Sequence, residues 1–246
     1  MKDGFIAVID SGVGGISVLR ELVRVLPNEC FLYYGDNDNV PYGNKRKDQL
    51  LSLALNLVNY VGSYPLKAIV LACNTLSLSV LFQIKPFAPA KVFGVFPPME
   101  ESVMKGQKTL LIATERTASF FKQNEYCDVV GLKTLAHHIE QNVFDLNNID
   151  ISQCFKAGNF SGHYINEKGY YDNVILGCTH YELIKNKIFD HFCPQTITSG
   201  TKFTVENVFE FIKNRKSLVK HKRNQILFVG DYAEKNKKAF ILSGQK

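Results

Sequence analysis

Short apolar runs alternate with amphipathic stretches along most of the chain. The first pair is an apolar run over residues 5–9 and, after a glycine-rich turn, apolar residues at helical spacing over 16–26. The same pattern predicts further strands at 30–34, 67–72, 91–95, 109–113, 173–176 and 225–229. It predicts further helices at 47–61, from 74 onward, at 135–146, from 179 to about 189, at 203–214 and over the last residues. Strands that alternate with helices indicate parallel sheets with covered faces. Residues 149–172 are polar and predict no element.

The chain carries an internal repeat. The strand that ends at Asp10 corresponds to the strand that ends at Thr114, and ACNT around Cys73 corresponds to GCTH around Cys178, with nearly the same displacement along the sequence. The repeat predicts an α/β fold of two similar lobes, each a mostly parallel sheet flanked by helices, with the active site in the cleft between them. We expect residues 1–96 with 206–246 to form the first lobe and residues 97–205 to form the second.

The composition is that of a folded protein. The chain has 246 residues, 46% of them hydrophobic, which suits two lobes of about 100 residues each, and the charged fraction of 21% is ordinary. Part of the net charge of +6 comes from a basic cluster, Lys213, Lys216, Lys220, Lys222 and Arg223. Because no base-reading motif or interleaved aromatic residue accompanies this cluster, we expect a solvated surface and no nucleic-acid partner.

The six cysteines and the first residues indicate where the protein works. The cysteines form no CxxC pair, which disfavours a structural zinc site and a thioredoxin-like motif, and no metal is expected. The chain opens without a signal-peptide pattern, and its longest apolar runs are too short to span a bilayer. We therefore expect a cytoplasmic protein with reduced thiols and no membrane partner.

Two cysteines stand at the carboxyl ends of predicted strands. Cys73 and Cys178 each lie where a strand passes into a helix, and ligands of open α/β sheets bind outside the carboxyl ends of strands. A helix N-terminus favours negative charge and can lower a thiol pKa from about 8.5 toward neutrality, so we expect each site to favour a thiolate. One cysteine after an apolar strand is usually a small buried hydrophobe. Two equivalent cysteines, each followed by polar residues, favour chemistry instead.

Two thiols that face one another suit racemisation. Inverting an α-carbon removes a proton from one face and returns one to the other, so two bases on opposite faces can act without either moving. The carbanion-like intermediate needs donors around its carboxylate. Candidates for these donors, together with helix N-terminal amides, are Ser11, Asn74, Thr75 and Thr179.

Ionisable residues stand near both cysteine segments. Asp10 ends the first strand, and we expect it to receive a proton from Cys73 or to hold the substrate ammonium. His180 lies two residues after Cys178 and is expected to serve that thiol in the same way. Glu140 lies in the helical stretch HHIEQN, where the pattern alone favours a plain surface carboxylate.

The loop DSGVGG at 10–15 joins the first strand to the first helix. A strand, a glycine turn and a helix can bind a dinucleotide, but the spacing here is not GxGxxG and no acidic residue is clearly placed downstream. We therefore disfavour a nucleotide and expect no cofactor. A small carboxylate resting on the loop amides is the better hypothesis.

At these residues the chain resembles the glutamate racemase family within the aspartate/glutamate racemase superfamily. The matching segments are VIDSGVGGISVLREL at 8–22, YYGDNDNVPYG at 33–43, IVLACNT at 69–75, VILGCTHYELI at 174–184 and VGDYAEKNKKAFIL near the end. The resemblance implies an isomerase that interconverts L- and D-glutamate without pyridoxal phosphate or another cofactor. It further implies a supply of D-glutamate for peptidoglycan, and hence a part in cell wall biogenesis and cell shape.

The resemblance also implies roles for single residues. Cys73 would act on D-glutamate and Cys178 on L-glutamate, and Asp10, Glu140 and His180 would be the assisting acid/base groups. The implied substrate-binding residues are Asp10, Ser11, Tyr42, Gly43, Asn74, Thr75, Thr179 and His180. The C-terminal segment would return to the first lobe.

Five single positions depart from the family pattern, and the segment TERTASFF around Thr117 matches the family's threonine-rich loop only irregularly. Leu76 follows CNT where the family usually has a small residue, and Asn39 replaces the arginine usual before VPYG. Pro97 replaces a glutamate, Glu182 a proline and Thr198 an aspartate. Both cysteine segments are intact, so the departures concern substrate identity and regulation rather than the thiol pair.

Three alternatives stay open. The closest is a racemase for aspartate or another acidic amino acid. A second is a metabolite-binding relative that has lost turnover, which the intact cysteine pair disfavours. A third is a thiol hydrolase that uses one cysteine with His180, which leaves the other cysteine unexplained. We further expect a homodimer, with glutamate as its small-molecule substrate.

Overall fold

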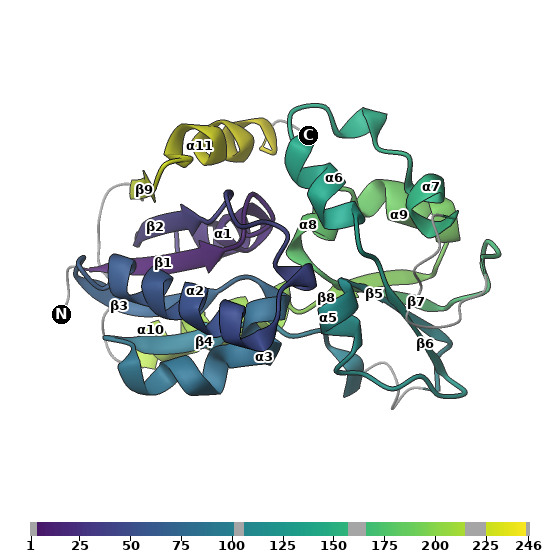
Figure 1. Ribbon diagram of the computed structural model, residues 1–246, viewed down its shortest axis with the longest axis horizontal. Helices are drawn as coiled ribbons and strands as arrows, with labels where there is room; N and C mark the ends of the chain where they lie inside the picture. The colour runs from purple at the N-terminus through teal and green to yellow at the C-terminus, as the bar shows by residue number, and fades with distance from the viewer. Residues whose placement is uncertain (1–3, 101–105, 157–165, 215–224, 245–246) are drawn as a thin grey trace.

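The computed structural model describes residues 4–100, 106–156, 166–214 and 225–244. In this part of the chain two parallel sheets are each flanked by helices, which confirms the predicted α/β class (Figure 1). The first sheet has the order β4 (Lys91–Gly94), β3 (Leu66–Leu71), β1 (Phe5–Asp10), β2 (Cys30–Gly35) and β9 (Gln225–Val229). The second has the order β6 (Cys127–Gly131), β5 (Thr109–Ala113), β7 (Asn173–Gly177) and β8 (Thr196–Ser199).

Helices cover both faces of the first sheet. On one face lie α2 (Lys47–Val61) and α3 (Asn74–Ile84), and on the other α1 (Ile16–Val25), α10 (Thr201–Asn214) and α11 (Ala233–Leu242). Side chains alternate along β1, so Ala7 and Ile9 join the first layer while Ile6 and Val8 join the second. Burial on both faces explains why β1 is an unbroken apolar run.

The second sheet is covered in the same way. One buried cluster joins its strands to α6 (Leu135–Gln141), α7 (Ile151–Lys156), α8 (Thr179–Glu182) and α9 (Lys185–Phe192), and a smaller cluster includes Ala118 of α5 (Glu115–Ala118). Single 3-10 turns lie at η1 (Tyr42–Asn44), η2 (Lys85–Phe87) and η3 (Leu146–Asn148). Each lobe therefore has its own core.

Several element boundaries differ from the prediction. The short strands β6 and β8 were not predicted; both are edge strands, and β8 is half exposed, so it shows no apolar run. The helix predicted over 135–146 ends at Gln141, because the Asn142 side chain bonds the His138 carbonyl and stops the last turn. The helix predicted from 179 breaks at Ile184, whose backbone leaves the helical region while its side chain is buried in the core.

Helix α10 crosses the predicted limit between the lobes at residue 205. It begins at Thr201 and packs against α1 and β4 of the first sheet, with Val205 and Val208 in that core. These contacts favour a lobe limit at about residue 200. The division into 1–96 with 206–246 and 97–205 otherwise stays a prediction.

Two expectations concern surfaces. Within the described ranges, none of the helices combines the length and apolar character that crossing a bilayer requires. Of the basic cluster, Lys213 is described and lies exposed, 3.7 Å from Glu210. The remaining four residues of that cluster lie outside the described part of the chain.

Candidate active site

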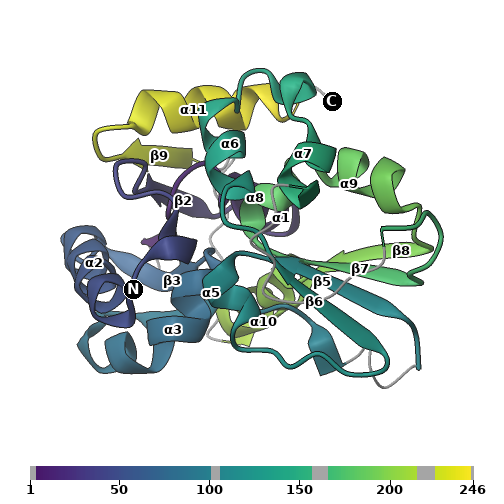
Figure 2. The same ribbon diagram turned by 45° about the vertical axis from the view of Figure 1, so that its right-hand side comes forward.

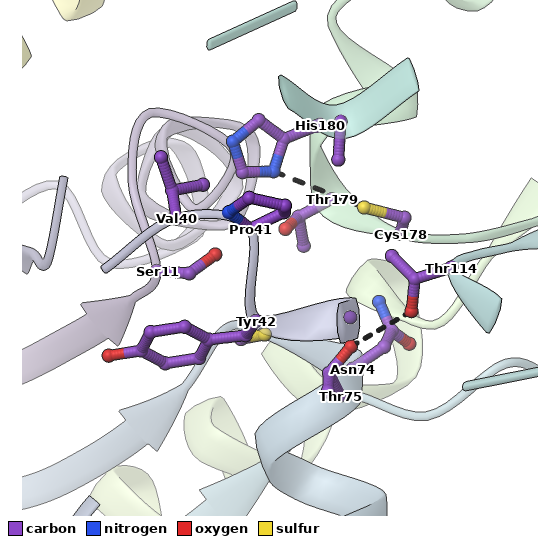
Figure 3. A pocket seen from close by; sticks show the side chains of 13 residues that line it. Ser11, Val40, Pro41, Tyr42, Asn74, Thr75, Thr114, Cys178, Thr179 and His180 are labelled. Carbon is purple, nitrogen blue, oxygen red and sulfur yellow. Dashed lines mark hydrogen bonds between the residues drawn. The ribbon is translucent and has the colours of Figure 1, made fainter. Parts of the chain in front are cut away.

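A pocket between the two lobes collects most of the residues that the sequence singled out (Figure 3). Its lining residues are Ser11, Val40, Pro41, Tyr42, Gly43, Cys73, Asn74, Thr75, Thr114, Ala136, Cys178, Thr179 and His180. Most follow the carboxyl ends of strands, as expected for an α/β sheet. The cavity volume is only about 10 Å³, room for about one water molecule. The pocket must therefore widen before an amino acid can enter.

The structure brings the two predicted cysteines to this pocket from opposite lobes. Cys73 follows β3 and immediately precedes α3, while Cys178 follows β7 and immediately precedes α8. Their side chains are buried, with 6% and 8% exposed. The two thiols are close enough for charge on Cys178 to raise the pKa of Cys73. Their catalytic roles stay predictions.

The thiol pKa expected from a helix N-terminus is wrong for Cys73. Burial raises the pKa of this thiol well above its ordinary value, and the charge of Asp10 raises it further. Amide hydrogen bonds from Leu76 and Thr75 at the start of α3 act in the opposite direction but do not prevail. A few amides cannot replace the water that a thiolate loses on burial. Cys73 therefore keeps its proton at neutral pH.

On the other side of the pocket a chain of contacts runs from Cys178 to Glu140. His180 places Nδ1 3.9 Å from the Cys178 sulfur and Nε2 2.9 Å from Glu140 Oε2 (Figure 3 shows the first contact). Burial alone would lower the pKa of His180, but its hydrogen bonds to Cys178 and Glu140 raise it well above the ordinary value. His180 is therefore an imidazolium, held between a sulfur and a carboxylate.

Glu140 is a buried carboxylate and not the plain surface residue that the pattern alone favoured. Burial opposes its charge, but the hydrogen bond and charge of His180 and hydrogen bonds from Lys235 and the Val13 amide lower its pKa to about 2. The resemblance to the family, rather than the helical pattern, pointed to this residue. It lies behind His180 and is not among the pocket-lining residues.

Asp10 lies fully buried beneath the glycine loop. Its Oδ2 accepts hydrogen bonds from the amides of Gly15 at 2.8 Å and Gly12 at 3.4 Å, and Oδ1 accepts one from Thr179 Oγ1 at 3.4 Å. Burial raises the pKa of Asp10 to about 6, against the lowering effects of His180 and the two amides. Asp10 can therefore exchange a proton near neutral pH.

The glycine loop serves the protein's own carboxylates. The amides of Gly12 and Gly15 donate to Asp10, and the amide of Val13 donates to Glu140 at 2.8 Å. The expectation that a substrate carboxylate rests on these amides is therefore wrong for all three. A Cβ at Gly12 would overlap the Glu140 carboxylate, and one at Gly14 would overlap the His180 ring. The glycines let the second lobe approach the first.

Hydroxyl and amide groups fill the rest of the pocket. The hydroxyls of Thr75, Thr114 and Thr117 lie 3.1 Å from one another. Asn74 Oδ1 is buried and has no hydrogen-bond partner among the described residues, so it can accept from a ligand. The Tyr42 hydroxyl donates to Asp36, so this side chain offers only its ring to the pocket.

Several residues of the site were not predicted from the sequence. Thr114 was seen as a polar strand end but was not assigned to substrate, although it lines the pocket. Asn37, Lys235 and Asn236 form the surroundings of Glu140. The polar loop GDNDN was the one local signal for Asn37, and the other two lie in the family-like segment VGDYAEKNKKAFIL, which pointed to neither residue.

The five departures from the family pattern all have partners in this structure. Leu76 is buried in the first core. The side chain of Asn39 donates to Asp36 at 3.0 Å, and Glu182 accepts from Thr201 at 2.6 Å. The hydroxyl of Thr198 bonds Asn173 at 3.3 Å, and the Pro97 carbonyl accepts from the Met99 amide at 2.9 Å. None of these contacts disturbs the thiol pair.

The described residues contain no group of three or more His, Cys, Asp or Glu side chains placed to hold a metal ion. All six cysteines are free thiols, and Cys30, Cys127, Cys154 and Cys193 lie outside the pocket.

Comparisons with known proteins agree with these motifs. No protein-family model matches the chain. A glutamate racemase from Clostridium botulinum is 32% identical over 238 residues, which cover 91% of this chain and 89% of that protein. The crystal structure of glutamate racemase from Thermus thermophilus in complex with β-chloro-D-alanine has a TM-score of 0.76 at 26% identity, covering 100% of this chain and 94% of that one. A glutamate racemase isoform from Bacillus anthracis has a TM-score of 0.77 at 25% identity, covering 98% and 95%. By sequence and by fold, this chain belongs to the glutamate racemase family.

Proposed function

We propose that the protein interconverts L- and D-glutamate by moving the substrate α-proton between Cys178 and Cys73, without a cofactor. One observation carries the proposal: the two thiols line one pocket from opposite lobes, and each has its own ionisable partner. Asp10 lies near Cys73, and the His180–Glu140 pair lies beside Cys178. A pair of bases across one carbon is what inversion needs.

The protonation of the pocket suits attack on L-glutamate. The His180 imidazolium lies 3.9 Å from the Cys178 sulfur, whereas Cys73 keeps its proton because it is buried near Asp10. The Cys178 thiolate removes the α-proton and becomes a thiol, and the electron pair left on the α-carbon spreads into the substrate carboxylate. Cys73 then donates its proton to the opposite face and becomes a thiolate, giving D-glutamate.

The reverse direction uses the same atoms. D-Glutamate meets the form that the forward reaction leaves, with a thiolate on Cys73 and a thiol on Cys178, and the Cys73 thiolate removes its α-proton. Asp10, whose pKa burial raises to about 6, can return a proton to Cys73 between turnovers. Cys178 then returns a proton from its side, with His180 and Glu140 adjusting the charge. Asp10, His180 and Glu140 are thus proposed as assisting acid/base groups.

Donors and acceptors around the pocket are proposed to bind glutamate. Asn74 Oδ1, which has no partner among the described residues, suits the substrate ammonium. Hydroxyls of Ser11, Thr75 and Thr179 suit its carboxylates, as the family resemblance implied. Gly43 also lines the pocket, and any larger residue at this position would place its Cβ against the Thr114 side chain. The Tyr42 ring contributes a wall rather than a hydrogen bond.

Proton exchange in heavy water tests the proposal. Each glutamate enantiomer is incubated with the wild type, Cys73→Ser and Cys178→Ser, and deuterium at the α-carbon and chirality are measured. We expect inversion with deuterium incorporation by the wild type, and loss of inversion in both variants because each lacks one of the two bases. The exposed Cys193 gives a matched control, since Cys193→Ser should keep full activity. Full racemisation by either pocket variant would rule out the two-thiol mechanism.

The same assay separates the alternatives. Aspartate in place of glutamate tests the closest rival, and faster turnover of aspartate would reassign the substrate. Binding of glutamate without α-proton exchange would indicate a relative that has lost turnover. An acyl intermediate trapped on Cys178 would indicate a thiol hydrolase.

Further expectations follow from the proposed activity. D-Glutamate made here would supply peptidoglycan synthesis, and therefore cell wall biogenesis and cell shape. A cytoplasmic location is proposed because the mechanism needs both thiols reduced, and all six cysteines are free in the structure. The homodimer stays a prediction, for which light scattering during gel filtration is the measurement.

A further inference from the structure

Glu140 joins the two lobes. Its carboxylate is 3% exposed and extends from α6 of the second lobe. Oε2 accepts from the Val13 amide at 2.8 Å and from His180 Nε2 at 2.9 Å. Oε1 accepts from Asn37 Nδ2 and from Lys235 Nζ, both at 2.6 Å. Among the described residues, three of these donors belong to the first lobe, and His180 alone belongs to the second.

The C-terminal helix α11 secures the Oε1 side of this carboxylate. Lys235, in the first turn of α11, also donates to the Glu140 backbone carbonyl at 3.3 Å. The next residue, Asn236, is fully buried and exchanges hydrogen bonds of 3.0 and 3.4 Å with Asn37. Helix α11 lies beside α6 in both ribbon views (Figure 1 and Figure 2). It therefore contacts Oε1 directly through Lys235 and supports it indirectly through Asn37.

We propose that Lys235 is a positioning residue for the half of the reaction that Cys178 performs. By fixing Oε1, Lys235 keeps Oε2 directed at His180 Nε2. That bond orients the imidazole so that Nδ1 faces the Cys178 sulfur at 3.9 Å. Lys235 is not among the pocket-lining residues, so its effect passes through Glu140 and His180.

The placement of the donors couples this effect to closure of the lobes. Val13, Asn37 and Lys235 lie in the first lobe, whereas Glu140 and His180 move with the second. An opening that widens a cavity of about 10 Å³ enough for an amino acid separates the two sets. Closure over the substrate brings them together again and restores the bonds from Val13, Asn37 and Lys235 that fix the Glu140 carboxylate behind His180.

The test uses a reaction that needs one base, and it rests on the proposed function. A glutamate with chlorine on its β-carbon loses the α-proton to one thiolate, then expels chloride as the Cα=Cβ double bond forms. The resulting enamine tautomerises and takes up water to give 2-oxoglutarate and ammonium, and no proton returns to the other face. Chloride release from each α-enantiomer therefore reports one thiol at a time. Cys73→Ser and Cys178→Ser show which enantiomer depends on which thiol.

We expect Lys235→Met to slow chloride release about tenfold for the enantiomer that depends on Cys178, the size expected for loss of a charge-assisted hydrogen bond. Release from the other enantiomer should be unchanged. Lys235→Arg keeps a charged donor and should recover most of the rate. Lys237→Met is the matched control, because Lys237 is exposed on the same helix and lies 3.8 Å from Glu234.

The two enantiomers also control for folding, since a damaged fold lowers both rates together. Should Lys235→Met not fold, Lys235→Gln carries the same comparison. If Lys235→Met releases chloride from each enantiomer at the wild-type rate, the inference is overturned and the proposed function stays intact. A parallel fall for both enantiomers in a folded variant would also overturn it. A wild type with neither chloride release nor α-proton exchange would overturn both.

Discussion

Burial has opposite outcomes for the ionisable side chains of this pocket, depending on their partners. It raises the pKa of Cys73, and the negative charge of the neighbouring Asp10 raises that pKa further. Burial raises the pKa of Asp10 to about 6, because two amides and the His180 charge offset only part of the lost hydration. At His180 the contacts with Cys178 and Glu140 outweigh burial, and the ring keeps its charge. The pocket therefore holds a proton on one thiol and a cation beside the other.

Asp10→Asn is expected to stabilise the fold at pH 8 while lowering racemase activity. Because the folded-state pKa of about 6 lies above the ordinary 3.8, the contribution of Asp10 to stability is fully present below about pH 3.8 and is lost as the pH rises through 6. The difference corresponds to roughly 3 kcal/mol. Urea unfolding of both proteins at pH 4 and pH 8 should show the gain mainly at pH 8. A variant less stable than the wild type at pH 8 would contradict this view of Asp10.

Among the elements, the sequence predicts those whose pattern of apolar residues lies within one continuous segment. The strands β1, β3 and β7 are apolar runs because both faces are buried, and the polar residues after them mark the site. The edge strand β8 is half exposed and carries no such signal. Glu140 was found only through the family resemblance. The pattern of its own helix cannot show that the first lobe covers its side chain. Lys235 was missed because its contact joins segments far apart in the chain.

Gly14→Ala tests whether the glycine loop exists to admit the second lobe. The added Cβ would overlap His180 Nδ1 and lie 2.8 Å from Thr179 Oγ1, so α8 must shift away from α1. A displacement on this scale should lower kcat/KM about 100-fold, and overpacking should cost about 1–3 kcal/mol of stability. Racemase rates and thermal unfolding measure the two effects. The control is Glu21→Ala on the exposed face of α1, which should change neither by much; wild-type rates in Gly14→Ala would show that the approach is not tight.

For the whole molecule, the small pocket and the contacts between the lobes indicate that the lobes must separate before an amino acid can enter. Thr75 of the first lobe meets Thr114 of the second at 3.1 Å, and Ser79 accepts from Arg116 at 3.0 Å. These contacts are polar, so water can replace them when the lobes separate. Two apolar side chains of the second lobe, Val143 and Leu183, also pack against the first core and would have to leave it, while the buried side chains of each core stay together. An opening motion therefore exposes some apolar surface but costs less than unfolding either lobe.

Amide hydrogen exchange can detect that motion, because two neighbouring amides have acceptors in different lobes. The Val13 amide donates to Glu140 of the second lobe, whereas the Gly15 amide donates to Asp10 of its own lobe. Opening exposes Val13 but leaves Gly15 bonded, so Val13 should exchange faster in the free protein. An equilibrated mixture of glutamate enantiomers keeps a constant composition during the measurement, and saturation with it should slow Val13 toward the rate of Gly15. NMR-detected exchange resolves the two amides. Equal rates in the free protein, unchanged by glutamate, would mean that the lobes do not separate at Glu140 and that substrate enters by another route.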